Sequence, residues 1–313
     1  MIAVLSKVLP LLLLILGGVI LKRTEYIQPS SLADIKKLVI NVSLPAILFR
    51  TFVYMELGAD QFYITVAVIV MLFLFYGGGW LVHKLFIKDD PFLPYTTTAF
   101  SFGLLSIPLF ATVFGAENLS VISILGMGHE LFIWIAFYNM MKMRFGGESV
   151  GLRDVLAIFR SPLVLSVLLG IVFNIIGFAS WVEAYPLLGA IDQSLVYLAG
   201  LATPLILFII GFTLKINPDH LGKSLQYLAI RYVIILVIGY AMKFLVIDLI
   251  APPSDLFNHA YYTFLITSPP FSLPIFAEQY AGRVQAEVTN NLVVLSIFMS
   301  LILYIPYLLI MVG

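Results

Sequence analysis

The stretch Ser106–Ala111 reads SIPLFA and the stretch Ser272–Ala277 reads SLPIFA, so nearly the same pattern occurs twice. Each copy places a proline inside an apolar segment and is soon followed by an aromatic residue and a glycine. A proline removes an intrahelical hydrogen bond that hydrocarbon cannot replace, so such a break persists only beside protein or a water-filled cavity. Paired interruptions in the two halves of a repeat commonly mark a transporter's substrate site. The two stretches therefore predict duplicated broken membrane helices.

The composition indicates an integral membrane protein. Hydrophobic residues make up 61% of the chain and charged residues 11%, and the mean hydropathy is +1.06, far outside the range of soluble domains. The apolar runs have the length of about 20 residues that a helix needs to cross a bilayer. We predict ten spans, at residues 4–22, 36–54, 62–87, 94–115, 119–143, 156–179, 190–214, 225–250, 260–282 and 287–311. The longest polar connection, 144–154, is too short for a soluble domain.

Basic residues gather beside the odd-numbered connections between these spans, although the formal net charge is zero. They are Lys22, Arg23, Lys36, Lys37, Lys84, Lys88, Lys142, Arg144, Arg153, Arg160, Lys215, Lys223 and Arg283. The positive-inside rule makes these connections cytoplasmic and predicts both termini outside the cytoplasmic membrane. The absence of cysteine excludes disulfides and thiolate metal sites. We expect neither a metal nor a cofactor.

The similarity between the two halves extends beyond the proline segments. Pro10–Gly18 (PLLLLILGG) aligns with Pro162–Gly170 (PLVLSVLLG), and Leu44–Phe49 (LPAILF) aligns with Thr203–Phe208 (TPLILF). Three landmarks thus recur in the same order. Since each repeat holds five spans, an odd number, the second repeat must enter the membrane inverted.

The predicted fold is therefore an all-α integral membrane protein with ten transmembrane helices. We place its two inverted five-helix repeats at residues 1–150 and 151–313. The fourth and ninth helices are predicted to be broken.

The chain resembles the auxin efflux carrier family over essentially its whole length. The matching stretches are Asn41–Phe49 (NVSLPAILF), Phe100–Gly115, His129–Trp134 and Ser268–Tyr280 (SPPFSLPIFAEQY). This family of membrane transporters includes plant PIN-type carriers and bacterial members, some of them proposed to move malonate.

The resemblance implies a scaffold of helices 1, 2, 6 and 7, a mobile transport unit of helices 3–5 and 8–10, and a homodimer. It also implies that the broken fourth and ninth helices cross, and that an anionic substrate bound beside the crossing moves by an elevator-like mechanism. The chain departs from many relatives at Ser101, where they have asparagine seven residues before Pro108. The shorter hydroxyl side chain can change the substrate or its hydrogen bonds.

Physical chemistry alone supports an anion site at the breaks. The amino ends of two half-helices each carry about half a positive charge, so a carboxylate can sit there without a paired lysine. Nearby hydroxyls can donate hydrogen bonds to it. The candidate substrate-binding residues are Ser101, Ser106, Pro108, Thr267, Ser268, Ser272, Pro274, Asn41 and Thr203. The alternative is that these prolines and small residues serve helix packing and kinks, which we favour for Asn41 and Thr203.

Three ionisable residues are candidates for proton coupling. His129 and Glu130 lie about ten residues into the fifth span, near the bilayer centre, where a charge is expensive. Either can exchange a proton during transport, or both can be permanent hydrogen-bonding groups between helices. Glu278 either faces the cavity or, as we favour, pairs with Arg283 near the cytoplasmic surface.

Enzymatic functions fit the sequence poorly. The four histidines are scattered, and Ile133 stands where the zinc-protease pattern that starts at His129 needs a second histidine. No phosphate-binding loop follows a strand, and no basic aromatic patch suggests nucleic acid. Arg50, Arg231, Lys243 and Asp248 lie near the ends of predicted helices, where long side chains can snorkel to water, and we assign them no chemistry.

The predicted function is secondary or facilitative transport of a small organic anion, either a malonate-like dicarboxylate or an indole-type monocarboxylate. No ATP-binding segment is evident, so movement must draw on a substrate, proton, sodium or voltage gradient. One alternative is sodium-coupled uptake like that of the bile-acid symporters, which share ten spans with broken fourth and ninth helices. Glu278, Gln279, Asn290 and Asn291 keep it open as oxygen donors. The other alternative is a non-transporting ligand sensor on the same fold.

Overall fold

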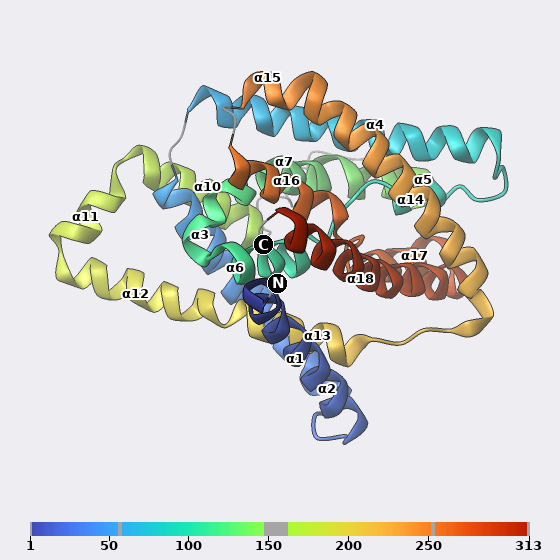
Figure 1. The fold of residues 1–313 in the computed structure, drawn as a ribbon, viewed down its shortest axis with the longest axis horizontal. Coiled ribbons are helices and arrows are strands. Elements are labelled where there is room, and N and C mark those ends of the chain that lie inside the picture. The colour runs from blue at the N-terminus through green and yellow to red at the C-terminus, as the bar shows by residue number, and fades with distance from the viewer. Residues whose placement is uncertain (1, 56–57, 147–161, 252–253, 312–313) are drawn as a thin grey trace. The chain divides into compact units, whose positions relative to one another are not determined.

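The structure of the chain is a computed structural model that describes residues 2–55, 58–146, 162–251 and 254–311. Every regular element in these ranges is helical, as Figure 1 shows, which confirms the predicted all-α class. The predicted repeat boundary at residue 150, most of the connection 144–154, and Arg153 and Arg160 lie outside these ranges.

The described helices include several that are long and apolar enough to cross a membrane. There are five of them in these ranges: Ala59–Leu85, Ala116–Gly146, Pro186–Thr213, Pro218–Ile250 and Arg283–Met311. A sixth is added if α10 (Pro162–Ile175) and α11 (Phe178–Ala184), which are bent by 74°, form one span. Gly177 between them has a φ of 75°, which glycine adopts without Cβ strain. The chain is therefore a multi-pass membrane protein, while the ten-span inverted arrangement stays a prediction.

The chain forms two compact units. The first unit comprises Met1–Leu57, Ile107–Ser123 and Val155–Leu214. The second unit comprises Gly58–Ser106, Ile124–Asp154 and Lys215–Gly313. Each unit thus gathers segments from both halves of the sequence.

Close helix packing organises the first unit. Its helices are α1 (Ile2–Arg23), α2 (Pro29–Leu38), α3 (Leu44–Tyr54), α6 (Ile107–Phe114), α10, α11, α12 (Pro186–Gly200) and α13 (Ala202–Thr213), with a π-helical turn at Val39–Ser43. Helix α1 packs on α13, and α10 packs on α3. Small residues permit such close approach of helix backbones in a membrane protein.

Two glycines make these contacts in an equivalent way. A Cβ on Gly18 would collide with the carbonyl oxygen of Phe208, and a Cβ on Gly170 would collide with that of Phe49. Gly18 and Gly170 are equivalent in the aligned repeats, as are Phe49 and Phe208. The two helix pairs therefore use the same landmarks reciprocally.

The second unit is built around long helices. Its elements are α4 (Ala59–Leu85), α5 (Leu93–Thr96), π-helical turns at Phe102–Ser106 and Ile133–Phe137, most of α7 (Leu119–Phe132), α8 (Tyr138–Gly146), α14 (Leu221–Met242), α15 (Asp248–Ile250), α16 (Asp255–Ile266), α17 (Leu273–Ala281) and α18 (Arg283–Met311). Leu93, Tyr227, Leu228, Tyr232, Val288 and Leu292 form a buried core that joins α5, α14 and α18.

The fourth and ninth predicted spans are interrupted, but the interruptions precede the prolines. They lie at Thr97–Ser101, after α5, and at Thr267–Ser272, after α16. Pro274 lies in the first turn of α17, where its missing N–H would have no intrahelical acceptor. Pro108 lies one residue into α6, directly after the π-helical turn, whose wider spacing accommodates the missing donor. The prediction that the chain breaks at the prolines themselves is therefore wrong by several residues.

Candidate functional site

The two interruptions contact each other within the second unit. The backbone N–H of Ser101 donates a hydrogen bond to the carbonyl of Ser268 at 2.7 Å. The hydroxyls of Ser106 and Thr267 lie 3.0 Å apart. All four residues are buried. Four of the residues predicted to bind substrate are thus together, and we call Thr97–Ser101 and Thr267–Ser272 the paired interruptions.

Ser101 combines burial with an unused hydroxyl. Its side chain is only 4% exposed, and its Oγ has no hydrogen-bond partner in the structure. Its carbonyl accepts from the amides of Leu105 and Ser106, so Ser101 begins the helical segment that follows. Such a hydroxyl has capacity to bond a ligand at the start of this helix.

Ser272 begins the helix that follows the other interruption. Its carbonyl accepts from the amides of Ile275 and Phe276, which starts α17. Its hydroxyl lies 3.1 Å from the hydroxyl of Tyr138, whose ring packs on Phe276 with 4.5 Å between centroids. Tyr138 is not among the residues predicted to bind substrate, because an aromatic residue in a membrane helix carries no signal of its own.

Arg231 contacts the backbone carbonyls of the paired interruptions. Its side chain is fully buried, and its guanidinium donates to the carbonyls of Thr96 at 2.7 Å, Ala99 at 2.9 Å and Thr267 at 3.2 Å. The prediction that Arg231 snorkels to water is therefore wrong. Carbonyls of two interrupted helices supply the charge-assisted hydrogen bonds that a buried guanidinium requires.

His129 approaches the same segment from α7. It is 2% exposed, and its Nε2 lies 3.0 Å from the backbone nitrogen of Phe100. Since a backbone N–H can only donate, Nε2 must be unprotonated, which assigns the proton of the neutral ring to Nδ1. Nδ1 lies 3.2 Å from Oε1 of Glu130. His129 therefore contacts the paired interruptions through one amide, and Glu130 contacts His129.

A single peptide group connects the side chains of Arg231 and His129. The carbonyl of Ala99 accepts from Arg231, and the N–H of the same peptide, at Phe100, donates to His129. The guanidinium also lies 5.0 Å from the centre of the Phe100 ring. Hydrogen bonds in series polarise one another, so Arg231, this peptide, His129 and Glu130 form one coupled chain.

Glu278 lies away from these contacts, in a polar region of the second unit. It is exposed and lines a cavity of about 530 Å³ with Lys215, Asn217, Pro274, Arg283, Glu287 and Asn290. Arg283 pairs with Glu287 at 3.1 Å, so the favoured pairing with Glu278 is wrong. Glu287 at i+4 on the same helix is the better-placed carboxylate.

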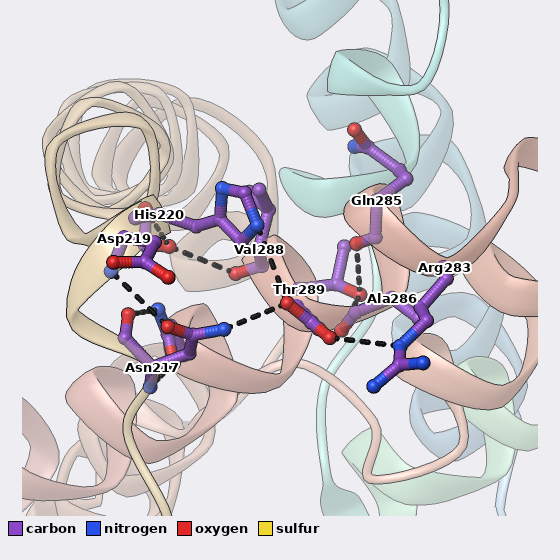
Figure 2. A network of polar contacts seen from close by, with 11 residues as sticks. Asn217, Asp219, His220, Arg283, Gln285, Ala286, Val288 and Thr289 are labelled. Atoms are coloured by element: carbon purple, nitrogen blue, oxygen red, sulfur yellow. Dashed lines mark hydrogen bonds and ion pairs between the residues drawn. The ribbon is translucent and has the colours of Figure 1, made fainter.

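Glu287 is the centre of that polar region. It also accepts from the side-chain amide of Asn217 at 2.7 Å and lies 3.2 Å from Nε2 of His220. In Figure 2, Asn217 and His220 lie on one side of this network and Arg283 lies on the other. The side chain of Asn291 is used by the backbone of Asn217, which gives it a structural role.

The remaining predicted site residues belong to the first unit. Asn41 is exposed in the π-helical turn Val39–Ser43. Pro108 is buried, and its carbonyl accepts from Thr112 at 2.8 Å. Thr203 lines a cavity of about 540 Å³, together with Thr112 and Arg50.

Arg50 in that cavity forms a two-point ion pair with Asp192, at 2.8 and 3.0 Å. It is therefore fixed by a partner helix, which the prediction of snorkelling did not anticipate.

Comparison with known proteins decides the class. Residues 3–307 match the model of a family described as membrane transport protein. The chain belongs to this family. The match confirms the resemblance to the auxin efflux carriers. The chain is also 27% identical, over 215 residues, to a curated protein of Methanothermobacter thermautotrophicus named "Uncharacterized transporter". The aligned residues cover 67% of this chain and 68% of that protein.

In this membrane transport protein, the hydroxyls and the histidine at the paired interruptions were predictable from the sequence, whereas Arg231 and Tyr138 were not predicted. Both lie on helices, α14 and α8, that are separated from the two interruptions along the chain. A charge inside the eighth predicted span, six residues after its start, was the available signal for Arg231, since intramembrane charges are rare and functional by default. Nothing comparable marked Tyr138.

Proposed function

We propose that this transporter carries a small organic anion across the cytoplasmic membrane, and that the paired interruptions bind its carboxylate. Two helical segments begin there, at Phe102 and at Leu273. The first amides of a helix have no intrahelical acceptor and carry a partial positive charge. Ser101 and Ser272 immediately precede the two segments. The buried, unpartnered Oγ of Ser101 carries the proposal, because it is a donor that no group among the described residues uses.

The fold that we propose for anion transport is an inverted repeat with a scaffold and a mobile unit. The reciprocal contacts of Gly18 with Phe208 and of Gly170 with Phe49 support the inverted relation of the two halves. The first unit gathers the first, second, sixth and seventh predicted spans, which supports the division into scaffold and transport parts. The segment Ile107–Ser123 also falls in the first unit, so the boundary differs from the one that the resemblance implies. The homodimer, the elevator movement and the outside termini rest on the family resemblance and the charge pattern.

His129 is the proposed point of proton coupling. A proton added at Nε2 would turn the acceptor of the Phe100 N–H into a donor, and two donors cannot face each other. Protonation of His129 would therefore release the backbone at one interruption. Glu130 would stabilise the resulting imidazolium through Nδ1.

Uptake into proteoliposomes tests the transport proposal. Radiolabelled malonate and indole-3-acetate are offered under imposed pH, sodium or voltage gradients. We expect anion uptake by the wild type and a fall of about tenfold or more in Ser101→Ala, the effect of losing a hydrogen bond to a charged group.

Ser43→Ala is the matched control, because Ser43 is also buried with an unpartnered hydroxyl but lies in the other unit. Uptake that needs sodium would favour the bile-acid symporter-like alternative. Tight binding without flux under every gradient would replace the carrier by a sensor. Equal losses in Ser101→Ala and Ser43→Ala would remove the paired interruptions as the binding site.

A further inference from the structure

Arg231 is a buried cation whose partners are backbone carbonyls. The three oxygens are those of Thr96 and Ala99 at one interruption and of Thr267 at the other. In the described part of the chain its guanidinium forms no ion pair with a carboxylate, and its Nε has no hydrogen-bond partner. The side chain therefore places one positive charge against the carbonyl ends of the segments that enter the paired interruptions.

Other protein donors bond the backbone carbonyls at the carboxyl end of α16. The carbonyl of Ile266 accepts from the hydroxyls of Tyr232 at 2.9 Å and Ser300 at 2.7 Å. The hydroxyl of Thr267 returns to the carbonyl of Phe264 at 2.9 Å. Protein donors thus cover the carbonyl side of the interruption, in contrast to the unused hydroxyl of Ser101 on the amino side.

The partial charges at the paired interruptions are therefore compensated unequally on the carbonyl side and on the amino side. A helix carboxyl end carries up to about half a negative charge and an amino end about half a positive charge. The guanidinium offsets the carbonyl ends of both interrupted helices. The two amino ends, at Phe102 and Leu273, keep their partial positive charge, which together approaches about one elementary charge.

We propose that Arg231 is the positioning residue that makes the paired interruptions selective for one carboxylate group. It fixes the backbone of both interruptions and cancels the negative potential that their carbonyls would present to an anion. This inference rests on the proposed anion transport and names its ligand class: a single carboxylate at the interruptions, with any second acidic group of the ligand outside them.

Two measurements on the full chain in lipid nanodiscs test the inference. The first compares binding of radiolabelled indole-3-acetate with its neutral amide, indole-3-acetamide, which differ only in the carboxylate. We expect Arg231→Gln to reduce the preference for the acid over the amide about tenfold or more, as expected when a charge effect at a dry site is removed.

The second measurement is hydrogen–deuterium exchange at Phe100 and Ser101, whose amides bond to His129 and Ser268. We expect both amides to exchange faster in Arg231→Gln. Lys243→Gln is the matched control, because Lys243 is also a buried cation of the second unit but pairs with Asp248 at 2.6 Å. It should change neither the exchange nor the preference for the acid.

The outcomes separate the inference from the proposed function. If the wild type does not prefer the acid to the amide, the anion site is wrong and the selective role of Arg231 falls with it. If the wild type prefers the acid and Arg231→Gln keeps that preference, the selectivity inference alone is overturned. Unchanged exchange in Arg231→Gln overturns the positioning role.

Arg231→Lys covers the case in which Arg231→Gln does not fold. Lysine keeps the charge but lacks the planar fork of donors with which the guanidinium bonds three carbonyls. The preference for the acid should then survive while exchange at Phe100 and Ser101 rises. Loss of the preference with the charge retained would contradict the inference.

Discussion

The backbone N–H of Phe100 donates a hydrogen bond to Nε2 of His129, 3.0 Å away, at the point where the fourth predicted span is interrupted. The donor and the acceptor are both buried, so water cannot replace either. Nε2 of His129 thereby holds the backbone of a segment that we propose to bind substrate.

Removing the imidazole acceptor should destabilise the protein. In His129→Phe the buried amide of Phe100 loses its partner, which costs about 1–3 kcal/mol. Thermal unfolding in detergent should show a lower Tm for this variant. His129→Gln offers a carbonyl oxygen of similar reach and should recover part of the loss. A Tm for His129→Phe equal to that of the wild type would mean that the hydrogen bond contributes nothing.

Ser106 and Thr267 should be energetically coupled across the two interruptions. Their hydroxyls are 3.0 Å apart, and Thr267→Val keeps the shape while leaving the Ser106 hydroxyl without this partner. We expect each single change, Ser106→Ala or Thr267→Val, to destabilise by about 1 kcal/mol, and the double change to cost less than their sum. Chemical denaturation of the four proteins measures the coupling. Strict additivity would show that the contact has no energetic effect.

Helix packing in the first unit should be intolerant of a methyl group at Gly18. A Cβ there would overlap the carbonyl of Phe208 on α13, and backbone cannot move away cheaply. We expect Gly18→Ala to destabilise by about 1–3 kcal/mol. Gly77→Ala in α4 is the matched control, since a Cβ at Gly77 meets nothing within 4 Å, and alanine should be neutral or stabilising there. A larger loss from Gly77→Ala than from Gly18→Ala would contradict this packing.

Part of the candidate site could be predicted because its signals are local. Ser101, Ser106, Thr267 and Ser268 stand beside duplicated proline segments, and His129 is a polar group in an apolar helix. The position of the breaks was less accessible. Pro108 and Pro274 are the visible disruptors, but Pro274 is accommodated in the first turn of α17 and Pro108 follows a π-helical turn, so the chain leaves the helix before both prolines.

The sequence by itself determined the all-helical membrane class, the family and the hydroxyl-rich character of the interruptions. Those features follow from composition, run length and short motifs, which need no knowledge of distant contacts. Only the tertiary structure decided that Arg231 binds carbonyls of both interruptions, that His129 accepts from Phe100, and that Arg283 pairs with Glu287 rather than Glu278. The reason is physical: a buried polar side chain takes whichever unsatisfied group the fold brings within hydrogen-bonding distance, and that distance is unrelated to separation along the chain.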